Sequence, residues 1–286
     1  SGKQMRPMLG LLMARACSCE GITDSTISYA AASELLHNAT LLHDDVADGS
    51  MKRRGVPTIM SLMGPSVSVL VGDYWLVKAM DLIMDADEGN GSGVMRIFSK
   101  TLKDLAAGEM LQLQKAQKGD TDEQDYLRII YSKTASLFEA TCVSAAKSVS
   151  ASQEYVEAAR AYAVALGIAF QIQDDILDYA GTDAVGKPLG ADILEQKITM
   201  PLLGAFANAG SQKEVHVRTL VADIVSHPEN RDEIVTFVKE NGGLEYAVSR
   251  LNSYVEAAVR ALDMFPESEA KDSLIELAHF TADRIM

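Results

Sequence analysis

The sequence predicts an all-α protein built as one large helical bundle. Its apolar residues recur at spacings of three and four, as on one face of an α-helix. No segment shows the alternation of apolar and polar residues between hairpin turns that is typical of strands. Several periodic segments exceed twenty residues, so each would span roughly 30 Å. Long helices with short loops pack antiparallel, and we expect a functional site in the middle of the bundle.

The individual helices follow from this period and from their end signals. The stretch SYAAASELLHNATLLHDD predicts a helix over about residues 25–48, which Thr23, Asp24 or Ser25 would cap and Gly49 would end. The same period predicts further helices at residues 66–86, 94–117, 122–150 and 154–180. Shorter helical runs follow, with breaks near Gly210, Pro228, Gly242–Gly243 and Pro266.

The overall composition limits the classes of protein. The 286 residues are 48 % hydrophobic, and the 7 prolines are dispersed without a linker, so we expect one domain over residues 1–286. The net charge of −14 argues against nucleic acid as a partner, although a local cationic pocket for small anions stays possible. The 3 cysteines form neither a disulfide framework nor a zinc pattern. There is no apolar run long enough for a transmembrane segment and no signal peptide.

One acidic motif occurs twice in the sequence. DDVAD at residues 44–48 returns as DDILD at residues 174–178, each time near the end of a long apolar helix. Asp44 then lies above Asp48, and Asp174 above Asp178, at a spacing where like charges repel. Hard oxygen donors without His or Cys favour Mg²⁺, which shares its shell readily with phosphates. A pair of solvated acidic helix ends is the alternative, and the matching copies beside basic residues argue against it.

Basic residues complete the pattern. Diphosphate groups need cationic donors, with Arg giving a bidentate grip and Lys a point charge. Five short stretches supply them, namely SGKQMRP, KRRG, YSKTASLF, GKPLG and EQKITMP. Any one of these residues alone would be assigned to the surface, so the case for a diphosphate site rests on the whole set.

The order of these motifs resembles that of the trans-type isoprenyl diphosphate synthases, in their long-chain branch. The resemblance covers nearly the whole chain, through G-K-x-x-R-P, L-L-H-D-D-x-x-D, R-R-G-x-P, K-T-A, F-Q-x-x-D-D-x-x-D, G-K-P-x-G-x-D and K-x-T-x-P. It implies the isoprenoid synthase fold with a central active-site cavity. It also implies a Mg²⁺-dependent prenyltransferase that condenses an allylic diphosphate with isopentenyl diphosphate.

The resemblance implies a role for each matching residue. Asp44, Asp48 and Asp174 resemble direct ligands of Mg²⁺, with three ions in that family's scheme, and Asp45 and Asp178 resemble outer or partial ligands. The residues that match the allylic diphosphate site are Arg53, Lys133, Gln171, Lys187 and Lys197, with Thr134 beside the departing oxygen. The residues that match the isopentenyl diphosphate site are Lys3, Arg6, His37 and Arg54.

Product length is predicted from one small residue. Ala39 lies about one turn before Asp44, where short-chain members of the family carry a large aromatic side chain. Because a small side chain leaves room for a growing apolar chain, we predict an all-trans product of about C35 to C50. The alternatives are a farnesyl or geranylgeranyl diphosphate synthase and a non-catalytic subunit of a heteromeric synthase. A terpene cyclase is disfavoured by the second aspartate motif.

The resemblance also implies the setting of the protein. We expect a homodimer in the cytoplasm, with peripheral membrane contact for product release and no transmembrane segment. A removed organelle-targeting leader stays an alternative. The family usually has a helix before the first lysine motif, which this chain lacks, so we expect the natural protein to carry one.

Overall fold

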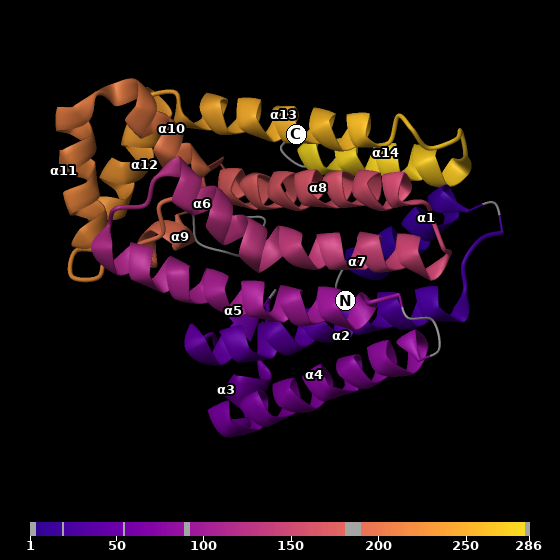
Figure 1. Cartoon of the computed structure of the whole chain (residues 1–286). Coiled ribbons are helices and arrows are strands. Elements are labelled where there is room, and N and C mark those ends of the chain that lie inside the picture. Colours follow the sequence, from indigo (N-terminus) through magenta and orange to yellow (C-terminus); the bar gives the residue numbers. More distant parts are fainter. Residues whose placement is uncertain (1–3, 19, 54, 89–91, 181–189, 284–286) are drawn as a thin grey trace. The chain divides into compact units, whose positions relative to one another are not determined.

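The computed structural model describes residues 4–18, 20–53, 55–88, 92–180 and 190–283, and these are almost entirely helical (Figure 1). The elements in chain order are α1 (Met5–Cys17), α2 (Asp24–Ala47), β1 (Lys52–Arg53), β2 (Val56–Pro57), α3 (Ile59–Met63), α4 (Pro65–Asp87), α5 (Val94–Lys118), α6 (Glu123–Ile130), the π-helix η1 (Tyr131–Ala135), α7 (Ser136–Ser148), α8 (Gln153–Ala180), α9 (Ala191–Leu194), α10 (Met200–Ala209), α11 (Ser211–Ala222), α12 (Asn230–Glu240), α13 (Gly243–Ala261) and α14 (Glu269–Asp283). The all-α fold class is confirmed. The short antiparallel β1–β2 hairpin was not predicted, since two-residue strands carry no periodicity.

The chain forms two compact units. The first consists of Ser1–Thr101, Leu137–Arg160 and Leu262–Leu274, and the second of Leu102–Ser136, Ala161–Ala261 and Ile275–Met286. The single domain stays a prediction, and each unit is described by itself below.

In the first unit, α2 begins and ends where its sequence signals lie. Thr23 is the N-cap, because its Oγ1 accepts a hydrogen bond from the backbone N–H of Thr26 at 3.1 Å. The Thr26 hydroxyl accepts the Thr23 backbone N–H in return at 3.0 Å, which completes a capping box. The helix ends at Ala47, and Gly49 follows with a φ of 62°, a conformation that glycine adopts without steric cost. The predicted bounds are therefore correct within one residue.

Helix α4 packs closely along α2 through small residues. The Ser68 hydroxyl donates to the backbone carbonyl of Leu42 at 2.9 Å. One turn later, a Cβ on Gly72 would lie 2.5 Å from His43 Nε2, so a larger residue would not fit there. Since Asp44 follows His43 directly, this contact holds the end of α2 that carries the first aspartate motif.

The second unit departs from the prediction at one point. The helix predicted over residues 122–150 is interrupted by η1, which carries the K-T-A motif. Glycines of two other helices press against this π-turn: a Cβ on Gly108 of α5 would lie 2.6 Å from Ser132 Cβ, and one on Gly167 of α8 would lie 2.6 Å from Ala135 Cα. A π-turn adds a residue to the turn, and such turns occur frequently at functional sites.

The last helices of the second unit follow the predicted breaks. α10 packs on α12 and α13 around the Phe206–Phe237 ring pair, whose centroids are 5.9 Å apart. Arg218 of α11 donates from Nη1 to the Gly119 carbonyl at 2.8 Å and from Nη2 to the Thr121 carbonyl at 3.2 Å. Its guanidinium also stacks 4.6 Å from the Phe206 ring centroid, so it ties α11 to the connection between α5 and α6. Among the described residues, no helix has the length and apolarity that a membrane crossing requires.

Candidate active site

The first aspartate motif occupies the last turn of α2, in the first unit. The Asp48 backbone N–H donates to the Asp44 carbonyl at 2.8 Å, so the two residues are one turn apart as predicted. Asp44 is half-buried and Asp48 is exposed. Asp45 is buried, and its Oδ1 accepts a hydrogen bond from Arg53 Nε of β1 at 2.8 Å. The β1–β2 hairpin therefore places Arg53, a predicted diphosphate-binding residue, in contact with the predicted metal-binding motif.

Three further predicted residues lie in the first unit. The Arg6 guanidinium of α1 stacks on the Phe138 ring of α7, with Cζ 4.9 Å from the ring centroid. His37 is half-buried on α2, two turns before Asp44. Ala39 is 1 % exposed, so it faces the interior of the unit. Their substrate roles stay predictions. Three other predicted residues lie outside the described residues, namely Lys3, Arg54 and Lys187.

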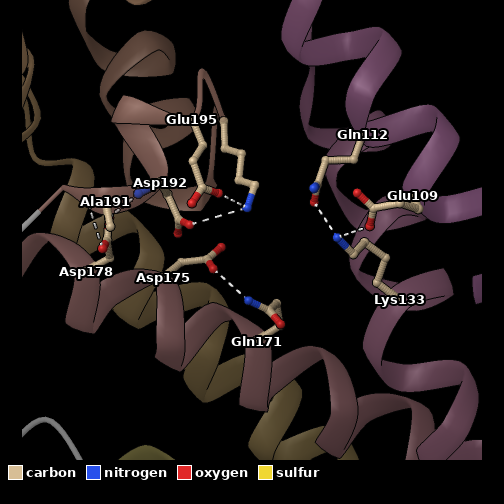
Figure 2. A network of polar contacts seen from close by, with 10 residues as sticks. Glu109, Gln112, Lys133, Gln171, Asp175, Asp178, Ala191, Asp192 and Glu195 are labelled. Carbon is tan, nitrogen blue, oxygen red and sulfur yellow. Dashed lines mark hydrogen bonds and ion pairs between the residues drawn. The ribbon is translucent and has the colours of Figure 1, made fainter. Parts of the chain in front are cut away.

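The second aspartate motif lies near the end of α8, in the second unit, and is linked to α9. Both oxygens of Asp178 accept backbone N–H groups from the start of α9, at 3.0 Å from Ala191 and 3.1 Å from Asp192 (Figure 2). The Asp192 carboxylate lies 3.9 Å from Lys197 Nζ, which also forms an ion pair with Glu195. A predicted metal-motif aspartate and a predicted diphosphate-binding lysine are thus brought together by one short helix.

Lys133 extends from η1 toward α5. Its Nζ donates to Gln112 Oε1 at 3.2 Å and forms an ion pair with Glu109 (Figure 2). Sequence analysis missed Glu109 and Gln112. Their spacing of three residues places them on one helix face, but nothing local in the sequence connects that face to Lys133.

Thr134 and Gln171 belong to a chain of buried polar groups. The Thr134 hydroxyl donates to Gln171 Oε1 at 3.0 Å, and Gln171 Nε2 donates to Asp175 Oδ1 at 2.9 Å. The Tyr126 hydroxyl donates to the other carboxylate oxygen, Oδ2, at 2.6 Å. Burial raises the pKa of Asp175 well above its ordinary value, and nearby Asp192 raises that pKa further. Burial likewise raises the pKa of Tyr126, with Asp175 as the next cause.

Two residues of this hydrogen-bonded series were not predicted. Asp175 was not predicted because the resemblance gave roles in the second motif to Asp174 and Asp178 alone, although it gave one to the matching Asp45 of the first motif. Tyr126 lies 49 residues before Asp175, and no motif pairs them. The middle aspartates of the two motifs therefore differ: Asp45 pairs with an arginine, whereas Asp175 takes two neutral donors.

The donor set fits Mg²⁺ held jointly with a ligand. The side chains are carboxylates, which are hard oxygen ligands, and Asp44, Asp48 and Asp174 retain some solvent exposure. Mg²⁺ usually keeps waters and binds through one or two carboxylates plus substrate phosphates, which partly exposed carboxylates in each motif allow.

The chain is similar to known proteins over nearly its whole length. Residues 1–240 match the polyprenyl synthetase family. An all-trans-nonaprenyl-diphosphate synthase (geranyl-diphosphate specific) of Rhodobacter capsulatus is 39 % identical over 286 residues, which are 99 % of this chain and 86 % of that protein. The crystal structure of a decaprenyl diphosphate synthase from Rhodobacter capsulatus has a TM-score of 0.89 at 36 % identity, covering 100 % of this chain and 87 % of that one.

A third relative was solved with ligands. It is a polyprenyl synthase from Caulobacter crescentus, complexed with calcium and isoprenyl diphosphate. Its TM-score is 0.89 at 34 % identity, and the match covers 100 % of this chain and 86 % of that one. The predicted long-chain branch and the predicted prenyltransferase class are confirmed by these relatives. This chain belongs to the polyprenyl synthetase family.

Proposed function

We propose that this chain condenses an allylic diphosphate with successive isopentenyl diphosphates into an all-trans polyprenyl diphosphate of about C35 to C50. Two findings support this range. The relatives named above include a nonaprenyl and a decaprenyl diphosphate synthase. Ala39, the residue expected to limit chain length, is small and buried.

The observation that carries the proposal is the set of side chains gathered around η1. Lys133 and Thr134 are adjacent in the π-turn, and Gln171 is hydrogen-bonded to Thr134. Breaking an allylic carbon–oxygen bond leaves negative charge on the diphosphate, and preorganised donors stabilise that charge in the transition state. Lys133 supplies a cation and Gln171 supplies an amide N–H for this purpose.

Two lysines that the resemblance assigns to the allylic diphosphate lie among the described residues of the second unit, and both are paired with carboxylates. Lys133 is paired with Glu109, and Lys197 with Glu195 and Asp192. These pairs are partly exposed, and exposed ion pairs are weak. A diphosphate carries more charge than one carboxylate, so it would compete for both lysines. In the first unit, Arg53 gives Nε to Asp45 and has further N–H donors for a diphosphate.

We place Mg²⁺ at both aspartate motifs. Asp44 and Asp48 would hold it in the first motif and Asp174 in the second, with Asp45 and Asp178 acting outside the inner shell. Three ions is the number that we propose, as in the family resemblance. When bound, Mg²⁺ neutralises charge on the leaving diphosphate. Water would react with an allylic cation, so we expect buried apolar side chains such as Leu137 to exclude it.

We also propose that the protein is a homodimer. Helix α4 exposes an apolar stripe of residues at spacings of four, three and seven, namely Leu70, Tyr74, Val77 and Met84. Apolar residues exposed together on one helix face, here interrupted by Asp81, are a typical feature of a protein–protein interaction surface. Light scattering of the wild type and of Val77→Glu tests this: a dimer that the substitution converts to a monomer supports the stripe as the interface.

The activity is tested with the purified chain alone. The chain is incubated with geranyl or farnesyl diphosphate, labelled isopentenyl diphosphate and Mg²⁺, and the products are separated by chain length. Products of about C35 to C50 support the proposal. Products that stop at C15 to C20 would favour the short-chain alternative. Absence of product from the correctly folded chain would favour a non-catalytic subunit.

A further inference from the structure

A buried line of hydrogen bonds leads from Tyr126 to Thr134. Tyr126 is 3 % exposed and Asp175 is 2 % exposed, and the three bonds of the line measure 2.6, 2.9 and 3.0 Å. We propose that Tyr126 and Asp175 are positioning residues, which hold the Gln171 amide in the one orientation that offers an N–H to the diphosphate. This inference rests on the proposed role of Gln171 at the diphosphate.

The Gln171 amide group has two orientations of nearly equal shape. A glutamine amide can turn by half a rotation, which exchanges its carbonyl oxygen and its NH₂ group with little change in shape. In one orientation Gln171 offers a donor to an anionic diphosphate, and in the other it offers a repelling oxygen. Asp175 Oδ1 is an acceptor, so it selects the orientation in which Nε2 faces Asp175. Oε1 then faces Thr134, whose hydroxyl must donate.

One amide proton is left for the substrate. Nε2 carries two protons, and Asp175 takes one of them. Among the residues that the structure describes, no acceptor takes the other. Gln171 is only half-buried, whereas Asp175 behind it is buried. The second N–H is therefore a donor whose direction is set from behind by Asp175 and from the side by Thr134.

Tyr126 holds the carboxylate itself. Its hydroxyl donates to Oδ2, so both oxygens of Asp175 have a donor and the carboxylate cannot turn without losing one. Oδ1 accepts from Gln171 whether or not Oδ2 carries a proton, so the orientation does not depend on the charge of Asp175. Tyr126 lies on α6, which runs directly into the π-turn with Thr134, so one segment anchors both ends of the line.

The chemistry predicts a rescue that a merely structural role would not show. Asp175→Leu removes the acceptor, and kcat should fall about tenfold or more, with the KM for isopentenyl diphosphate unchanged. Asp175→Asn should restore only part of that kcat. Its amide can turn either its oxygen or its NH₂ toward Gln171, because the Tyr126 hydroxyl can donate or accept, so only some of the molecules keep the productive orientation of Gln171.

Tyr126→Phe makes a second test. It removes one of the two donors that hold the Asp175 carboxylate, so Gln171 is held less firmly. We expect kcat to fall while the KM for isopentenyl diphosphate stays unchanged. Tyr246→Phe is the matched control, since it removes a hydroxyl bond of the same 2.6 Å length, to Glu123 in the same unit. It should lower the melting temperature without changing kcat.

The role of Gln171 at the diphosphate and the positioning role of Tyr126 and Asp175 can be tested separately. If Gln171→Ala keeps its kcat, the proposed role of Gln171 at the diphosphate is wrong. If Gln171→Ala loses kcat while Asp175→Leu does not, that role stands and the positioning inference is wrong. An unchanged kcat in Tyr126→Phe, or a kcat of Asp175→Asn no higher than that of Asp175→Leu, would also overturn the inference.

Discussion

The π-turn of η1 should depend on the missing side chain of Gly167. A Cβ at this position would lie 2.6 Å from Ala135 Cα and 2.8 Å from Ala135 Cβ. The nearest atom is backbone, so it cannot rotate away. Ordinary van der Waals contact begins at 3.4 Å, so Gly167→Ala must displace the backbone of η1 or α8 by about 0.8 Å.

The size of the effect follows from that displacement. Inserting a methyl group into packed structure lowers the free energy of unfolding by about 1–3 kcal/mol. Replacing a helical glycine by alanine raises it by about 1 kcal/mol. Stability should therefore fall by roughly 0–2 kcal/mol, which leaves a folded protein. Thr134 precedes Ala135, and a misplacement of about 1 Å at a reacting group can lower the rate about 100-fold. We expect kcat to fall by a factor on the order of 10 to 100.

The assay compares kcat for isopentenyl incorporation with the melting temperature. Gly10→Ala is the control, because its Cβ would meet the side-chain methyl Cγ2 of Thr141 at 3.2 Å rather than backbone. Gly10→Ala should keep the wild-type kcat. A folded Gly167→Ala variant with kcat within about twofold of wild type would refute the claim that the π-turn positions the catalytic residues.

Three other changes give separate expectations. Ala39→Tyr should shorten the products to about C15–C20 in chain-length analysis, because its ring would fill the space required by the growing chain, and unchanged long products would contradict the proposed role of Ala39. Asp44→Ala should lower kcat by at least about 100-fold while circular dichroism stays unchanged, and near-normal turnover would exclude this residue as a metal ligand. Burial raises the pKa of Asp175 above its ordinary value of 3.8, so its contribution to stability is fully present below that pH and is lost as pH rises through the folded pKa. Asp175→Asn, uncharged at every pH, should therefore raise the metal-free melting temperature at pH 8 and leave it unchanged near pH 4, whereas an equal shift at both would count against a buried charge.

The two aspartate motifs show how far a repeat in sequence predicts a repeat in structure. Both lie on the ends of long helices, as their spacing indicated. Their middle residues have different partners, since Asp45 meets Arg53 from a hairpin eight residues away and Asp175 meets Tyr126 from another helix. The sequence distance of 49 residues between Asp175 and Tyr126 explains why no motif indicated their contact.

The sequence by itself determined the long helices α2, α4, α5 and α8 to within one residue and the chemical class of the protein. Helix periods, the Thr23 cap and the turn at Gly49 act over a few residues, so they can be read locally. Tertiary structure alone decided the conformation and the partners of the catalytic segment. The π-turn over Tyr131–Ala135 depends on Gly108 and Gly167, which approach it from two other helices. Such contacts depend on which distant backbones can come close together, and that depends on the packing of the whole unit.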